Sequence, residues 1–131
     1  MQVVKPFDIE DALQKDLNVI ESGYRFFAPP IPPDLKDGDV LITRVGGVDV
    51  SAASHAHDVS IDCYASDEEH ATMMANAVHA IVSSLPLRNT NIQYSNATAN
   101  LPYKNFDPRA PELARETFRA TITCPGQRIT F

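Results

Sequence analysis

The residues best suited to chemistry gather at His55-Ala56-His57-Asp58. On a strand, two histidines separated by one residue place both imidazoles on one face, as some metal sites require. A small metal-dependent enzyme that uses His55, His57 and Asp58 is therefore one hypothesis for this chain. No third ligand follows at a diagnostic spacing. We therefore expect a solvent-exposed or interface histidine pair, with no metal and no other cofactor.

The remaining reactive residue types lack the settings that catalysis needs. His70 lies in the expected first turn of a helix, and His79 flanks the apolar face of the same helix. Cys63 and Cys124 occupy inward positions of expected strands, which predicts two buried, reduced thiols. The chain has neither a glycine-rich phosphate loop nor a serine in a nucleophile elbow. These patterns predict a protein that is not an enzyme.

One strand and one long helix, within 58–85, organise the rest of the chain. Apolar residues alternate with polar ones over 58–65, which predicts a half-buried strand. Ser66 and Glu69 have the spacing of a capping box, so the helix is expected to begin at Ser66 and to end at Pro86. Its apolar face comprises Ala71, Met74, Ala75, Val78, Ile81, Val82 and Leu85.

Further elements are expected on both sides of this unit. Asp8 is a suitable N-cap for a helix over 8–21. Strands are predicted over 24–27, 40–45, 58–65, 91–99 and 114–124. The glycine pair at 46–47 is expected to end the second of these, with a loop or hairpin arm over 48–57 and a C-terminal tail over 125–131.

This order of elements predicts an α+β fold in one domain that spans 1–131. We expect a mainly antiparallel or mixed sheet of four to five strands, with two helices packed on one face. At 131 residues with 44% hydrophobic residues, the chain can bury an ordinary core without disulfides. No apolar run is long enough to span a bilayer, so we expect no membrane association. The formal charge of −6 argues against a nucleic-acid-binding surface.

Polar strand faces form a candidate subunit-interface or lumen surface. They carry Asp58, Ser60, Asp62 and Tyr64 on the strand over 58–65, and Thr117, Arg119, Thr121 and Thr123 on the strand over 114–124. If helices cover the other side of the sheet, these residues meet either water or a neighbouring subunit. Both interpretations stay open from the residues alone.

A proline-rich loop over 28–39 is a second candidate surface for a partner. Its centre is Pro29, Pro30, Ile31, Pro32 and Pro33. Prolines block helices and central strands and favour stiff, extended backbone. The loop is therefore either a connector or a partner-binding segment.

Three stretches, taken together, resemble a known family. They are the strand over 40–45 with Arg44-Val45-Gly46-Gly47, the strand over 59–65 with the alanine-rich helix that ends in Ser84-Leu85-Pro86, and the stretch from Leu101-Pro102-Tyr103 through Asp107-Pro108 to the strand over 116–123. In order and spacing, they resemble the tail terminator (tail completion, or tail-to-head joining) proteins of long-tailed bacteriophages, and the actinobacteriophage versions in particular. The resemblance covers about residues 8–124.

The resemblance implies a structural virion protein at the tail–neck junction, made in the host cytoplasm. Members of this family form a hexameric ring that caps the tail tube, ends its polymerisation and joins the tail to the head connector. The implied partners are other copies of the chain, the major tail tube protein and a head-completion protein. Six chains of −6 each total −36, so an acidic lumen would repel DNA, which passes without specific binding.

Other hypotheses stay open beside the ring-forming tail terminator. Another phage neck protein, such as a head–tail adaptor or a stopper, would bind on the portal side. The small metal-dependent enzyme would hold a stoichiometric metal at His55 and His57. A protein with no assembly role would show no self-association.

Overall fold

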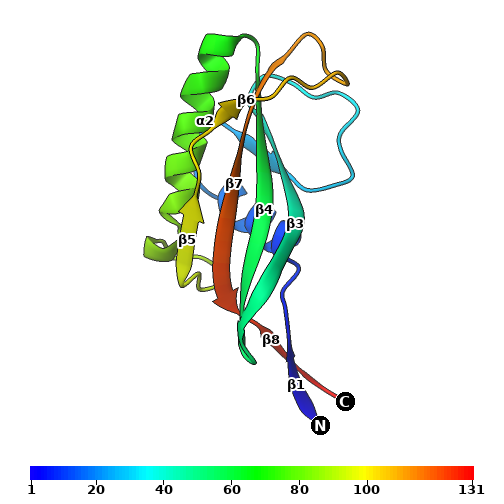
Figure 1. The fold of residues 1–131 in the computed structure, drawn as a ribbon, viewed down its shortest axis with the longest axis vertical. Helices are drawn as coiled ribbons and strands as arrows, with labels where there is room; N and C mark the ends of the chain where they lie inside the picture. The colour runs from blue at the N-terminus through cyan, green and yellow to red at the C-terminus, as the bar shows by residue number, and fades with distance from the viewer.

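A long antiparallel hairpin forms the centre of the fold. In the computed structural model, which describes all 131 residues, β3 (Asp39–Ser51) and β4 (Ser54–Ala65) pair along nearly their whole lengths (Figure 1). β7 (Ala114–Pro125) pairs antiparallel with the other edge of β4. The segment 48–57 is thus a hairpin arm, with regular strand on both sides of a turn at Ala52 and Ala53.

Short strands extend the sheet at both edges. β2 (Arg25–Phe27) pairs parallel with the start of β3, whereas β5 (Asn96–Ala99) and β6 (Tyr103–Lys104) pair antiparallel with β7. The six-stranded sheet has the order β2-β3-β4-β7-β5, with β6 beside β7. The predicted α+β class with a mainly antiparallel sheet is confirmed. The additional strand is β6, which lies in a stretch that the sequence pattern left irregular.

The ends of the chain form a separate ribbon. β1 (Gln2–Lys5) and β8 (Gln127–Thr130) pair antiparallel and project beyond the end of the six-stranded sheet (Figure 1). The prediction of a C-terminal tail over 125–131 is therefore wrong, since Pro125 still belongs to β7 and β8 follows. Its partner strand comes from the opposite end of the sequence, which no local pattern could indicate.

The first helix, α1 (Ile9–Asn18), joins the chain start to the hairpin. Asp8 is its N-cap, as predicted, but the helix ends before Glu21. The Glu10 carboxylate accepts a hydrogen bond from the backbone N–H of Arg44 at 2.7 Å. This contact ties the first turn of α1 to the middle of β3.

The second helix, α2 (Glu68–Ser83), is capped by Asp67. The Asp67 carboxylate accepts a hydrogen bond from the backbone N–H of His70 at 2.8 Å. The predicted start at Ser66 is therefore wrong, because the Asp67 side chain reaches the free N–H groups of the first turn. A 3-10 turn, η1 (Leu85–Leu87), follows the helix.

Both helices contribute side chains to one apolar core. Its strand members include Val59, Ile61 and Cys63 of β4. Its members from α2 are Ala71, Met74, Ala75, Val78 and Val82. Cys63 and Cys124 are free and buried, as predicted. Neither helix combines the length and the hydropathy that crossing a membrane requires.

Gly46 and Gly47 bend β3 without ending it, so the predicted break at this pair is wrong. The register with β4 shifts between Arg44 and Gly46, which marks a β-bulge. Gly46 and Gly47 adopt φ angles of +152° and +150°, a region that favours glycine. A Cβ atom on Gly47 would lie 2.3 Å from the carbonyl oxygen of Ala56. Glycine therefore lets the two strands approach closely here.

Candidate assembly surface

The predicted polar surface lies on the sheet face that points away from the apolar core. Asp58, Ser60 and Asp62 alternate along β4 with core residues, so their side chains leave the opposite face. The register pairs them, in that order, with Thr121, Arg119 and Thr117 of β7. Thr123 continues this face of β7 and is half-buried. The structure thus brings the two predicted groups together in one strip.

Threonine hydroxyls hold the acidic side chains of this strip in place. Thr121 Oγ1 donates to the Asp58 carboxylate at 2.7 Å, and Thr117 Oγ1 donates to the Asp62 carboxylate at 2.6 Å. Both carboxylates are half-buried, whereas Arg119 is exposed. The strip therefore presents ordered acidic acceptors beside one cation, an arrangement suited to a polar protein contact.

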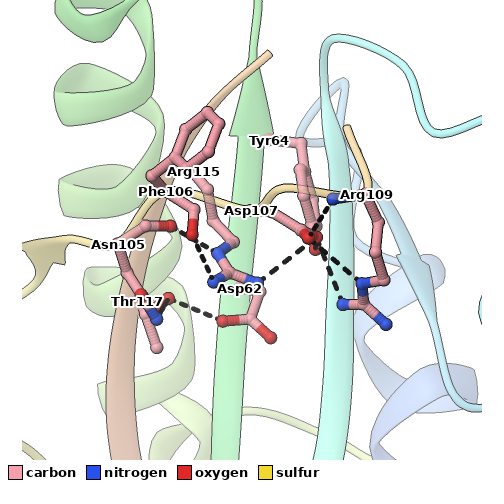
Figure 2. A network of polar contacts seen from close by, with 8 residues as sticks. All are labelled: Asp62, Tyr64, Asn105, Phe106, Asp107, Arg109, Arg115 and Thr117. Carbon is pink, nitrogen blue, oxygen red and sulfur yellow. Dashed lines mark hydrogen bonds and ion pairs between the residues drawn. The ribbon is translucent and has the colours of Figure 1, made fainter. Parts of the chain in front are cut away.

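Tyr64 and Thr117 are buried, so the prediction that they belong to an open surface is wrong. Tyr64 is 0% exposed and Thr117 is 2% exposed. The segment 105–113 covers this end of the sheet: Asn105 Nδ2 donates to Thr117 Oγ1 at 3.2 Å, and the Tyr64 hydroxyl donates to Asp107 at 2.7 Å (Figure 2). Alternation along a strand shows which face a residue occupies, but not whether a distant segment covers it.

Asp107 is the centre of the polar network that fixes this covering segment. Its side chain is 1% exposed, accepts hydrogen bonds from Tyr64 and Arg109, and lies 3.3 Å from Arg115 Nη1 (Figure 2). Burial alone would raise the pKa of Asp107, but the hydrogen bonds from Arg109 and Tyr64 and the charge of Arg115 hold this pKa well below its usual range.

Tyr64 is the neutral partner in this network. Burial, and then the hydrogen bond to Asp107, raise the pKa of Tyr64 to about 12. At neutral pH the carboxylate is ionised and the phenol keeps its proton. The pair therefore serves as a clamp that holds the segment on the sheet.

Arg115 completes the clamp through the backbone. Its Nε donates to the carbonyl oxygen of Asn105 at 2.5 Å, and its Nη2 donates to that of Phe106 at 3.1 Å (Figure 2). Sequence reasoning missed this network. The available signal was the turn at Asp107-Pro108-Arg109, in which the Arg109 N–H donates to Asp107 Oδ1 at 2.9 Å.

The proline-rich loop lies beside the clamped segment. Pro29, Pro30 and Pro33 are exposed, Ile31 is 38% exposed, and Pro32 is half-buried. Residues 31–35 and 109–113 line a cavity of about 430 Å³. The irregular segment ends at Gly38 rather than at the predicted Asp39, which already belongs to β3. Most of the loop is exposed, and its role as a partner-binding segment stays a prediction.

The histidine pair is buried, so the expectation of solvent-exposed side chains is wrong, whereas the interface alternative stays a prediction. His55 is 6% and His57 is 5% exposed, on the core side of β4. Asp58 leaves the opposite face and bonds to Thr121, so the three residues of the enzyme hypothesis do not converge. No group of three or more His, Cys, Asp or Glu side chains is placed to hold a metal ion.

Both imidazoles keep an unpaired ring nitrogen in this position. His55 Nδ1 and His57 Nε2 are buried and have no hydrogen-bond partner. Burial, followed by the proximity of His55, lowers the pKa of His57. The pair lines a groove of about 800 Å³ together with the β3 segment from Arg44 to Asp49 and with Pro6. The two histidines therefore form one wall of an open groove at the end of the hairpin.

Comparison with known proteins adds no family to this description. No protein-family model matches the chain, and no curated protein matches it. The functional proposal therefore depends on the residues, their geometry and the resemblance to tail terminators.

Proposed function

We propose that the chain is a structural virion protein that forms a hexameric ring at the neck of a long-tailed phage. In this role it caps the tail tube, ends tube polymerisation and joins the tail to the head connector. The observation that carries the proposal is the unit β3–β4–α2 with β7. This unit contains most of the stretches that resemble tail terminators, and the remaining residues, 84–86 and 101–113, directly follow α2 and precede β7. The unit folds as one sheet with a helix that shares its apolar core.

The polar strip supports an assembly role for the outer face of this unit. Asp58 and Asp62 are held in fixed orientations by threonine hydroxyls, and Arg119 stands exposed between them. Ordered charges of both signs set the register and orientation of a protein contact. If the strip instead faces the lumen, its carboxylates repel the phosphates of passing DNA.

The overall charge agrees with passage of DNA through the ring. The chain carries a formal charge of −6. At physiological salt, repulsion acts over a Debye length of about 8 Å, so acidic groups need only line the channel wall to keep DNA from adhering. Specific DNA binding is not part of the proposal.

A tube-elongation assay tests the proposed function. Purified major tail tube protein is allowed to polymerise, and the chain is added at increasing ratios while tube length is measured. We expect elongation to stop at substoichiometric ratios, because only tube ends need to be occupied. Elongation that continues unchanged would contradict the proposal, and binding only to portal complexes would favour the adaptor or stopper hypothesis.

Two charge-reversal variants test, in the same assay, whether the polar strip takes part in the contact that stops elongation. Arg119→Glu should raise the concentration that stops elongation about tenfold, because a fixed cation at the contact becomes an anion. Arg88→Glu makes the same charge change at an exposed residue after η1 and should leave that concentration unchanged. Equal behaviour of the two variants would remove the strip from the contact.

A further inference from the structure

The ribbon formed by β1 and β8 lacks the support that such a structure normally has. It is a two-stranded sheet, so the outer edge of each strand is unpaired. Val3, Val4 and Ile129 on it are only half-buried. A two-stranded ribbon by itself is marginally stable in water and is stabilised by pairing with a further strand.

The free edge of β3 offers a place for such a strand. β2 covers β3 only from Asp39 to Leu41, so the rest of that edge has no strand partner. Val45, Val48 and Val50 are 43%, 70% and 59% exposed along it. A long exposed edge with apolar side chains is a template for strand addition.

The regular part of this edge matches the ribbon in length. Register shifts flank Gly46–Asp49, which pairs with β4 without interruption. β1 and β8 are each four residues long. A groove of about 800 Å³ lies over one face of the hairpin here, lined by this part of β3 and by His55 to His57 of β4.

Charge favours a second copy of this chain as the source of that strand. The ribbon strands carry Lys5 and Arg128 and no acidic side chain, within a chain whose formal charge is −6. At the acceptor edge, the Asp49 side chain is 82% exposed. The basic ribbon of one copy is therefore electrostatically complementary to the acidic position on the edge of another.

We infer that the β1–β8 ribbon of one copy pairs with β3 at Gly46–Asp49 of the next copy. Donor and acceptor are different parts of the chain, so the contact is head-to-tail and can repeat until a ring closes. This inference rests on the proposed function for the closed ring, and it names the contact that builds it.

Two variants test the contact, each altered on only one of its two surfaces. Self-association of the full chain is measured by light scattering up to about 1 mM, a concentration at which contacts of millimolar affinity are detected. The acceptor variant is Val48→Lys, and the donor variant is the double change Lys5→Glu with Arg128→Glu. Each should dissociate the assembly and weaken self-association about 100-fold or more. Met73→Lys, at a residue of α2 that is 64% exposed, is the matched control for Val48→Lys and should assemble normally. Arg88→Glu controls the charge reversal.

Mixing the two variants gives the decisive result. Each variant keeps one intact surface, so the mixture should form dimers and no larger species, although each variant alone is monomeric. The inference is overturned if the variants assemble like the wild type, if the mixture stays monomeric, or if the wild type is monomeric throughout the concentration range. Rings that form through this contact but do not bind tail tubes would contradict only the proposed function. Variants that still form rings and cap tubes would contradict only the inference.

Discussion

Asp107 combines almost complete burial with a full set of charged and polar partners. The carboxylate is bonded by Tyr64 and Arg109 and lies beside Arg115, and together these residues fix the segment that covers one end of the sheet. Removing a buried charge from such a network leaves the remaining donors without their acceptor. The network therefore matters to stability at a point where sequence reasoning predicted an open strand face.

The first prediction concerns Asp107→Asn. We expect the free energy of unfolding, measured by urea titration at pH 7, to fall by about 2–4 kcal/mol, because charged hydrogen bonds and an ion pair are lost. Asp34→Asn, at a carboxylate with a 73% exposed side chain, should change it little. The pKa of Asp107 in the folded protein lies below the ordinary value of 3.8. The stability that its charge provides is therefore present above about pH 4 and lost as pH falls toward the native pKa. The difference between wild type and variant should shrink over that range.

The second prediction concerns the buried histidine. The pKa of His57 is lowered from 6.5 in the folded protein, so the unfolded chain takes up a proton first. The free energy of unfolding should therefore decrease as pH falls below about 6.5 toward the native pKa. His57→Phe should make this decline shallower in urea titrations between pH 7.5 and pH 5. An unchanged decline would show that protonation of His57 does not cause it.

The pKa of His70 is shifted in the opposite direction to the pKa of His57. Its pKa is raised, first by the hydrogen bond to Asp67. The contribution of His70 to the free energy of unfolding is therefore complete below its pKa in the unfolded chain. This contribution is lost as pH rises through its pKa in the folded protein. His70→Gln should leave the decline below pH 6.5 in place, which separates the two histidines.

At the scale of elements, the strand–helix unit was predictable because its signals are local. The alternation of Val59, Ile61 and Cys63 and the three-and-four spacing of the α2 core residues both survive in the structure. The N-cap is Asp67 and not the predicted Ser66, a difference of one residue that is common at helix ends. Periodicity within one element thus identified the core without any knowledge of the partners.

The third prediction uses adjacent methionines of α2. Met74 is 3% exposed and belongs to the core, whereas Met73 is 64% exposed. Met74→Ala should lower the free energy of unfolding by about 2–5 kcal/mol, the range for emptying a buried site. Met73→Ala should have little effect, since it removes few packing contacts. Similar losses in urea titrations of the two variants would show that α2 does not pack as described.

The elements that were missed all depend on contacts between distant parts of the chain. β1 and β8 pair across almost the entire sequence, and the clamp at Asp107 covers Tyr64 from a segment more than forty residues later. β3 continues beyond Gly46 and Gly47 because β4 pairs with its second half, from Gly46 to Ser51. The sequence therefore predicted the polar strand face but not the segment that covers one end of it. The role of the polar strip as a subunit interface or lumen surface stays a prediction at Asp58, Ser60, Asp62, Arg119, Thr121 and Thr123.

In the whole molecule, the sheet separates an apolar face from a polar one. One face carries the apolar core, to which both helices contribute side chains. The opposite face carries the polar strip. The ribbon and the open β3 edge lie at the end of the hairpin, away from the clamped segment (Figure 1). A ring built through that end would leave the polar strip and the proline-rich loop free for the tube, the lumen or the head connector.

Electron microscopy of tail tube ends tests whether the chain forms a ring on the tail tube. Purified tubes are mixed with the chain, and class averages of their ends are compared with those of tubes alone. We predict additional ring-shaped density with sixfold symmetry at one end of each tube, and no density along the tube wall. Tube ends that look the same with and without an excess of the protein would contradict the proposed ring at the tail tube.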